Sequence, residues 1–288
     1  MGGSLRAVRA IDVEHLGRER VICCYELDGL LVDPGPESCV ETLLDKLGEG
    51  FEPRALMLTH IHFDHAGASG ALVRRWPDVP VYVHERGAGH MADPERLVAS
   101  ARRLYGEDFD RLWGEVVPVP EGNLRVLEGG EQAEGLRVAY TPGHASHHVS
   151  YLHESGGTAF VGDVAGVRIE PAEIVIAPTP PPDIDVEAWN RSIDLVEGWR
   201  PSALALTHFG MVTSRIEDHL EALRDQLAEE AQLARDRSAE EFAAGLRAQI
   251  IDAVGEQAAA AFLQAAPPDQ IFQGLERYWR KRAERETA

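Results

Sequence analysis

The chain has 288 residues, of which 44% are hydrophobic and 26% are charged, a composition typical of globular proteins. Acidic residues outnumber basic residues by 48 to 28, so the net charge of −20 repels polyphosphates and anionic membrane surfaces and excludes nucleic acid as an expected partner. The sequence has no apolar run near the ~20 residues of a membrane span, and residues 1–10 lack the apolar core of a signal peptide. We therefore expect a cytoplasmic protein.

Two short β-type runs, at residues 21–25 and 30–32, begin the predicted sheet, and Asp28-Gly29 between them predicts a hairpin turn. The following residues 37–47 have apolar side chains at helical spacing and predict a helix. Between hairpin and helix, Asp33 is either a turn residue or a carboxylate that holds a neighbouring loop in place. The cysteines are odd in number and two are adjacent, which predicts buried free thiols at Cys23, Cys24 and Cys39.

Four side chains of metal-binding types fall within six residues, directly after a predicted strand at residues 55–58; they are His60, His62, Asp64 and His65. In an extended chain His60 and His62 point the same way and can share one ion, whereas the adjacent Asp64 and His65 diverge. The spacing therefore indicates two metal ions. The alternative, that these histidines only cap a helix and pack, is disfavoured by so dense a cluster. A catalytic metal also needs an open position for water, so we expect more ligands elsewhere in the chain.

The sequence after this cluster predicts a helix at residues 66–76, a strand at 79–84 and a helical connection at 94–114. Aromatic side chains of the connection favour core packing over a wall against a substrate or a dimer face; they are Tyr105, Phe109 and Trp113. Further strands are predicted at residues 116–119, 124–127, 136–140, 149–153 and 158–161. This order of elements implies sheets that are covered by helices.

Three more predicted strands end in a side chain that can bind a metal. The ligand candidates are His144, Asp163 and His208, after predicted strands 136–140, 158–161 and 203–206. His144 is a better candidate than the nearby His147 and His148, because a Pro-Gly turn before it fixes its direction. Strands that repeatedly finish in ligands predict convergence at one edge of a sheet, which packing alone does not explain.

With these residues in this order, the chain resembles the metallo-β-lactamase-fold proteins. The resemblance rests on His60-x-His62-x-Asp64-His65, Thr141-Pro142-Gly143-His144, Gly162-Asp163 and Thr207-His208, with Asp33-Pro34-Gly35 as an early turn. It implies an α/β fold, an αββα sandwich with two metal ions in a cleft at one edge. The complete ligand set is most similar to the glyoxalase II and lactonase branch, since many β-lactamases of this fold have a cysteine where Asp163 stands.

The resemblance divides the ligands between two ions: His60, His62 and His144 for the first, Asp64, His65 and His208 for the second, and Asp163 as the bridge. Zinc is the expected metal, with iron and manganese as alternatives, because imidazole and carboxylate ligands accept all three. The implied enzyme hydrolyses a small-molecule ester, thioester or lactone with a hydroxide that bridges the two ions. Asp64 is the expected catalytic residue, since a free carboxylate oxygen can steer this hydroxide and carry a proton.

Two other functions are compatible with these ligands. An oxygenase similar to persulfide dioxygenases would hold one iron at the first ligand set and Asp163, and a non-catalytic metal-binding module would need no substrate. The complete second set favours hydrolysis. The tyrosine common in lactonases of this fold has no evident equivalent in the sequence. Arg168 is either a contact for an anionic substrate group or a solvated side chain, and the proline-rich residues 178–183 are either a connector or the rim of the cleft.

The composition changes near residue 213, which predicts a boundary between residues 1–213 and a C-terminal helical extension at residues 214–288. Ser214 and Ser238, each followed by Glu three residues later, predict two capped helices, and a third follows Pro267-Pro268. We expect these helices to cover the cleft or to form a homodimer contact. Basic residues of the last helix are either a solvated helix end or, as in glyoxalase II, contacts for glutathione; they are Arg277, Arg280, Lys281, Arg282 and Arg285.

Overall fold

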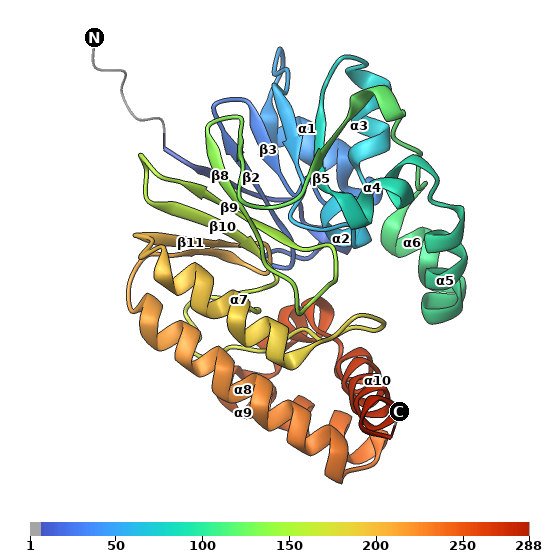
Figure 1. Cartoon of the computed structure of the whole chain (residues 1–288), viewed down its shortest axis with the longest axis vertical. Helices are drawn as coiled ribbons and strands as arrows, with labels where there is room; N and C mark the ends of the chain where they lie inside the picture. The colour runs from blue at the N-terminus through green and yellow to red at the C-terminus, as the bar shows by residue number, and fades with distance from the viewer. Residues whose placement is uncertain (1–6, 288) are drawn as a thin grey trace.

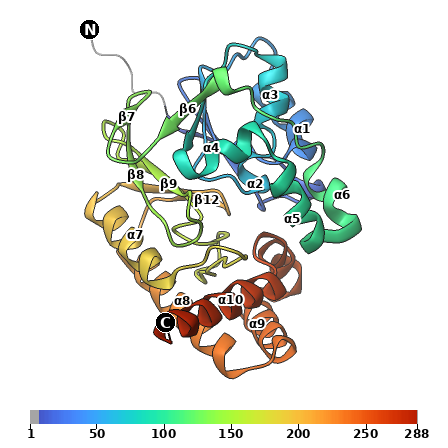
Figure 2. The same ribbon diagram turned by 45° about the vertical axis from the view of Figure 1, so that its right-hand side comes forward.

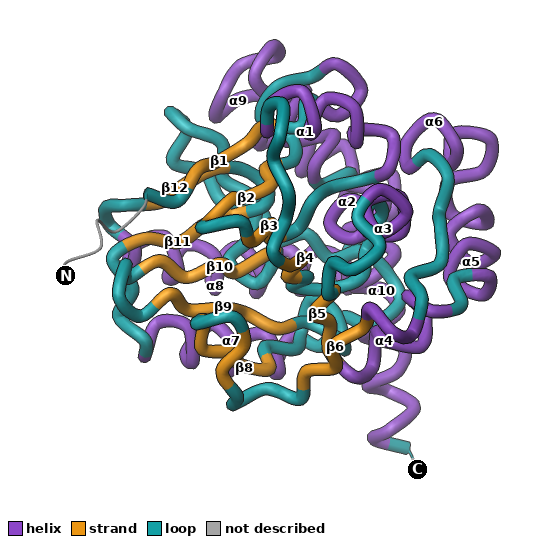
Figure 3. Tube along the Cα trace, turned by 90° about the horizontal axis from the view of Figure 1, so that it is seen from above, coloured by secondary structure: helices purple, strands orange, loops and turns teal. Residues whose placement is uncertain are grey.

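The computed structural model describes residues 7–287, so part of the segment searched for a signal peptide lies outside it. Two six-stranded sheets face each other, with helices on their outer sides (Figures 1 and 3). The strands of the first sheet, in order, are β1 (Arg9–Asp12), β2 (Cys23–Leu27), β3 (Leu30–Val32), β4 (Ala55–Met57), β5 (Val81–His84) and β6 (Leu124–Leu127). The second sheet contains β7 (Gln132–Ala133), β8 (Leu136–Tyr140), β9 (Val149–His153), β10 (Thr158–Gly162), β11 (Ala203–Leu206) and β12 (Gly210–Val212).

Helices form the two outer layers. The helices near the first sheet are α1 (Val40–Leu47), α2 (Phe63–Ala66), α3 (Ser69–Arg75), α4 (Glu85–Ala92), α5 (Glu95–Tyr105) and α6 (Phe109–Trp113). On the side of the second sheet lie α7 (Val186–Gly198), α8 (Ile216–Asp236), α9 (Ala239–Ala265) and α10 (Pro268–Glu286). The predicted αββα layering is confirmed. Between residues 7 and 287, none of the helices is both long and apolar enough to cross a bilayer.

Alternation along the strands separates the hydrophobic core into layers. In β2, Cys23 and Tyr25 belong to the cluster between the two sheets, whereas Cys24 belongs to the cluster under the helices. Side chains alternate across a strand, so one strand can serve both layers. Tyr25 meets Phe160 of the facing sheet with ring centroids 5.7 Å apart. All three cysteines are buried and free, as predicted, and burial raises the pKa of Cys23 to about 12, which makes this thiol a poor nucleophile.

Strand direction brings several strand ends to one edge. The hairpin predicted at Asp28-Gly29 is present, since β2 and β3 pair antiparallel with Leu27 opposite Leu30, and β3 runs parallel to β4. In the second sheet β8 and β10 are each antiparallel to β9, so they run the same way, and β11 is parallel to β10. The carboxyl ends of β4, β8, β10 and β11, where the ligand candidates follow, therefore lie at corresponding edges.

Two predicted elements are wrong in detail because of local backbone chemistry. Residues 116–119 are not a strand: Pro118 and Pro120 lack the N–H groups of a ladder, and the amide of Val119 instead donates to Met91. The helix predicted at residues 66–76 is two helices, α2 and α3. The amide of Gly67 still donates to the carbonyl of Phe63, but that of Ala68 donates to the carbonyl of Gly35 instead of continuing the helix.

The three predicted C-terminal helices are present, but only one of the two predicted capping boxes forms. Ser238 and Glu241 form a capping box at the start of α9. The box predicted at Ser214 is wrong, because α8 begins at Ile216 and its N-cap is Arg215, in a left-handed conformation with no side-chain cap. The C-terminal helices share a hydrophobic core with the outer face of the second sheet, through residues such as Leu220 and Leu223.

Candidate metal centre

The structure brings all seven ligand candidates together at the edge where the strands end. They lie in the loop after β4 (His60 and His62), in α2 (Asp64 and His65), after β8 (His144), after β10 (Asp163) and after β11 (His208). Their ligand atoms form overlapping groups of three within 4.8 Å of one another. We call these seven residues the ligand cluster.

Three imidazole nitrogens form the first half of the cluster. His62 Nδ1 lies 2.9 Å from His60 Nε2 and 3.0 Å from His144 Nε2. Two ligands of a tetrahedral ion with bonds of about 2.0–2.1 Å are roughly 3.3 Å apart, so these nitrogens are close to the spacing of three ligands of one ion. Burial, then the neighbouring His144, lowers the pKa of His62 to about 3, so its nitrogen keeps a free lone pair at neutral pH.

The second half of the cluster mixes imidazole with carboxylate. His208 Nε2 lies 3.3 Å from Asp64 Oδ2, and His65 Nε2 lies 3.8 Å from the same oxygen. Burial alone would lower the pKa of His65 and His208, but the neighbouring Asp163 and Asp64 raise both pKa values above the ordinary one. This half therefore favours positive charge, whether a proton or a metal ion supplies it.

Asp163 lies between the two halves and turns one oxygen toward each. Its Oδ2 is 3.3 Å from His144 Nε2 in the first half. Its Oδ1 is 3.2 Å from His65 Nε2 and 3.6 Å from His208 Nε2 in the second half. Burial favours the neutral acid, but the nearby His65 and His208 bring the pKa of Asp163 well below its ordinary value. A buried, ionised carboxylate in this position can bridge two cations.

Hydrogen bonds behind the rings fix which nitrogen faces inward. The Nδ1–H of His144 donates to the Pro178 carbonyl at 2.8 Å, and that of His208 donates to the Val21 carbonyl at 2.6 Å. A carbonyl oxygen can only accept, so both rings carry their proton on Nδ1 and turn the Nε2 lone pair toward the cluster. His65 is held similarly, by Asp33 Oδ2 at 2.8 Å from its Nδ1.

Asp33 joins several parts of the site. Of the two roles left open by the sequence, a turn residue or a carboxylate that holds a neighbouring loop, the structure supports the second. The residue is fully buried, with a left-handed φ of 48° after β3. It accepts hydrogen bonds from the amide and hydroxyl of Thr59, at 2.8 and 2.7 Å, and from the hydroxyl of Thr207 at 3.0 Å. Together with His65, these contacts connect the ends of β3, β4 and β11 directly beneath the ligand cluster.

The donor set fits divalent cations. Three of its buried atoms have no hydrogen-bond partner among residues 7–287: His65 Nε2, His208 Nε2 and Asp163 Oδ1. Buried polar atoms are normally paired, and these three all face the second half of the cluster. Imidazole nitrogen with carboxylate oxygen is the ligand chemistry of zinc, iron and manganese sites. The residues present therefore suit metal ions at both halves.

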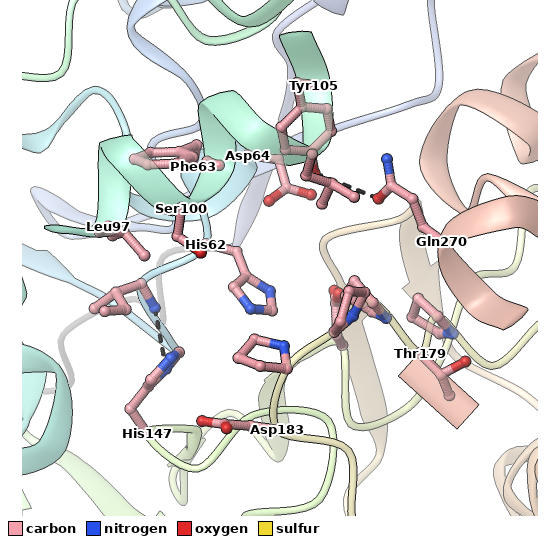
Figure 4. A pocket seen from close by; sticks show the side chains of 18 of the residues that line it. His62, Phe63, Asp64, Leu97, Ser100, Tyr105, His147, Thr179, Asp183 and Gln270 are labelled. Atoms are coloured by element: carbon pink, nitrogen blue, oxygen red, sulfur yellow. Dashed lines mark hydrogen bonds between the residues drawn. The ribbon is translucent and has the colours of Figure 1, made fainter. Parts of the chain in front are cut away.

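A cavity of about 310 Å³ opens over the cluster (Figure 4). Its floor includes His62, Asp64 and Asp163. We call the other walls the roof: side chains of α5 and α6, the proline-rich residues 178–182, and residues 265–271 at the start of α10. The roof is mainly apolar and contains Leu97, Leu104, Trp113, Ala266 and Ile271. Figure 2 shows the start of α10 beside α5 and α6, and the Tyr105 hydroxyl donates to Gln270 Oε1 across this junction at 3.3 Å.

Several residues lie differently from what the sequence favoured. Of the three aromatic side chains, Phe109 and Trp113 belong to one buried cluster and Tyr105 packs against it, but Tyr105 and Trp113 also line the cavity. His147, considered only as a competing ligand, lines the cavity as well. Arg168 is not among the cavity residues, and the basic residues Lys281, Arg282 and Arg285 line a neighbouring groove. The only sequence feature that pointed to Tyr105 and Trp113 was their position in the predicted helical connection. The only feature that pointed to His147 was its position three residues after His144.

Comparisons with known proteins agree with this fold. A relative in Sulfurisphaera tokodaii, the metallo-beta-lactamase fold-containing protein ST1585, is 28% identical over 212 residues, which cover 70% of this chain and 77% of the relative. The crystal structure of ST1585 matches with a TM-score of 0.67 at 23% identity and covers 94% of this chain and 99% of that chain.

Two further similarities concern hydrolysis and metal binding. A hydroxyacylglutathione hydrolase of Hamiltonella defensa is 49% identical over 134 residues, or 46% of this chain and 41% of that enzyme. The crystal structure of TTHA1623 in a di-iron-bound form matches at 27% identity with a TM-score of 0.52, covering 75% of this chain and 94% of that chain. The sequence profile of the metallo-beta-lactamase superfamily matches residues 21–208, which include the whole ligand cluster. The chain is therefore a member of the metallo-beta-lactamase superfamily.

Proposed function

We propose that this protein is a hydrolase of small esters, thioesters or lactones that works with two divalent metal ions, zinc being the expected metal and iron or manganese the alternatives. The observation that carries the proposal is the position of Asp163, whose two oxygens each face a different half of the ligand cluster. A single-metal site would need only one of these halves. The di-iron form of TTHA1623 is consistent with this interpretation.

Two bound cations would supply an activated water at neutral pH and polarise the scissile carbonyl group. The side chains of this chain account for the rest of the chemistry. Asp64 is 22% exposed, whereas the side chains of His65, His208 and Asp163 are nearly inaccessible, so Asp64 is the carboxylate that can exchange a proton with a substrate in the cavity. The apolar roof excludes water from the other side of the reacting group.

The cavity favours a substrate with an apolar portion, because its roof consists largely of aliphatic, aromatic and proline side chains. The neighbouring groove shares Arg86, Ser146 and Asp183 with the cavity and contains basic residues of α10. A substrate that fills both would combine an apolar acyl group with a polar or anionic remainder. The similarity to hydroxyacylglutathione hydrolase supports a thioester within this class.

Metal content and turnover test this proposal together. Purified protein is analysed for metal equivalents per chain, and the metal-loaded form is assayed on a glutathione thioester, a series of lactones and aryl esters of increasing acyl length. We expect two equivalents and hydrolysis of at least one class. One iron per chain with oxygen consumption on a persulfide substrate would identify the oxygenase instead. Two bound metals without turnover on any class would support the non-catalytic module.

A further inference from the structure

His147 lies on the cavity wall beside the first half of the ligand cluster without belonging to it. Its ring stacks at 6.1 Å from that of His60 and meets the ring of His62 edge-on at 5.7 Å. The residue is 9% exposed and borders the cavity. Helix α4 packs directly behind it, since a side chain at Gly87 would lie 2.7 Å from Ile61 and 3.6 Å from the Cβ of His147. The ring is therefore held in place.

The protonation of this ring follows from its one hydrogen bond. The backbone amide of Ile61 donates to His147 Nδ1 at 3.4 Å, as the dashed line in Figure 4 marks. An amide can only donate, so Nδ1 holds the lone pair and the proton of the neutral ring is on Nε2.

The Nε2–H group has no acceptor among residues 7–287. Asp183 is the carboxylate whose charge acts on His147, but its Oδ2 accepts a hydrogen bond from the hydroxyl of Ser146. The Nε2 atoms of His65 and His208 are fully enclosed and have no partner. The Nε2 atom of His147 is not enclosed in this way, because His147 borders the cavity. A donor that is fixed, neutral and unpaired at a pocket wall is suited to a ligand oxygen.

We propose that His147 binds the substrate, with its Nε2–H donating a hydrogen bond to an oxygen of the acyl group beside the first half of the ligand cluster. This inference rests on the proposed hydrolase function and adds a residue to it. The tautomer of His147 is the reverse of that of His144 and His208, whose protons are on Nδ1. The ligand histidines thus offer lone pairs to cations, whereas His147 offers a proton to an oxygen.

Paired substitutions test the role of this proton. In His147→Gln the side-chain amide can place an N–H near the position of Nε2, whereas His147→Leu removes the donor at similar size. We expect His147→Leu to lower kcat/KM about 10- to 100-fold, by an equal factor from pH 6 to 9, and His147→Gln to recover most of it. Metal content and Tm should match the parent in both. Equal kcat/KM in His147→Leu and the parent, or equal loss in both variants, would overturn the proposal.

A second measurement is independent of turnover. Long-range ¹H–¹⁵N correlation spectra of the zinc-loaded protein identify the tautomer of His147, and we expect a proton on Nε2 whose resonance shifts when octanoate, a product-like carboxylate, is added. A proton on Nδ1, or no shift on addition, would overturn the inference. Absence of hydrolysis by the parent protein on every substrate class would instead contradict the proposed function, while these spectra would still decide the binding role of His147.

Discussion

The ligand cluster and the roof face each other across one cavity, but they are built differently. The cluster is polar, buried, and held by hydrogen bonds to fixed groups such as the carbonyl of Val21 and the carboxylate of Asp33. The roof is mainly apolar and comes from three separate segments of the chain. Across the junction of α5 with α10, the hydrogen bond described is the one between Tyr105 and Gln270. Under the proposed function, the cluster supplies the chemistry and the roof selects the substrate.

The largest effect should follow from breaking the cluster at its centre. In Asp163→Ala both halves lose their shared carboxylate, so we expect loss of bound metal and a fall in kcat/KM of at least about 10³-fold. Metal analysis and steady-state assays measure both. Asp183→Asn is the matched control for metal content, because Asp183 borders the same cavity without facing a cluster histidine at ligand distance. Full activity in Asp163→Ala would contradict the assignment of the cluster.

A smaller effect should follow from removing the support beneath the cluster. Asp33→Ala leaves the donors of Thr59, His65 and Thr207 without their acceptor, so we expect metal affinity to fall about 10- to 100-fold. Competition with a chelator measures the affinity. The free energy of unfolding should also fall, by about 3–5 kcal/mol, since buried partners are left unpaired. If Asp33→Ala bound metal as tightly as the parent, the carboxylate would be only a structural part of the turn.

The roof should change substrate use while the metals stay bound. A side chain at Gly274 of α10 would lie 1.9 Å from the carbonyl oxygen of Thr179, so Gly274→Ala must displace α10 or the proline-rich rim. We expect KM to rise several-fold and the free energy of unfolding to fall by about 1–3 kcal/mol. The metal content should stay close to that of the parent, because the rim supports only one of the seven ligands, His144, through the Pro178 carbonyl. Gly89→Ala in α4 is the control, since no atom of residues 7–287 outside its own helix backbone and chain neighbours lies within 4 Å of the added methyl group. Loss of metal in Gly274→Ala as complete as in Asp163→Ala would contradict this division of roles.

The smallest functional effect is expected at a buried carboxyl of α8, remote from catalysis. Burial raises the pKa of Glu230 from 4.5 to about 8, although the hydrogen bond from Gln226 lowers it. Between these values the folded protein holds a proton that the unfolded chain releases. The associated stability is therefore complete below pH 4.5 and decreases as pH rises toward about 8, by up to about 1.4 kcal/mol per pH unit.

Glu230→Gln removes this titration and keeps a side-chain acceptor for the amide of Ala177. We expect a flatter dependence of the free energy of unfolding on pH between 5 and 8, measured by urea denaturation, with unchanged kcat/KM. Parallel stability curves for Glu230→Gln and the parent would show that the carboxyl is already ionised in the folded protein. A changed kcat/KM would show that Glu230 of α8 influences the ligand cluster, contrary to this expectation.

The sequence predicted most strands and the convergence of the ligand candidates, because both depend on local signals. Each ligand candidate follows an apolar run, so His144 and His208 could be placed at strand ends without knowledge of the fold. The left-handed backbone of Asp33 and its contacts with Thr59 and Thr207 could not be foreseen, because its most distant hydrogen-bond partner is 174 residues away.

The roof was less predictable for a related physical reason. Apolar side chains on a helix have the same spacing whether they face a core or a cavity, so Tyr105 and Trp113 were indistinguishable from Phe109. The tautomer of His147 depends on the amide of Ile61, which approaches it only in the folded chain. Residues 116–119 have a β-type composition, yet the prolines beside Val119 deny the segment a ladder.

The contacts of Asp33 also order events during synthesis. Its first partner, Thr59, leaves the ribosome soon after it, but Thr207 and the last ligand, His208, follow much later. Until then the ligand cluster lacks His208, and the carboxylate of Asp33 lacks the hydrogen bond from Thr207. The group of Asp64, His65 and His208 is therefore complete only after β11 has joined the sheet.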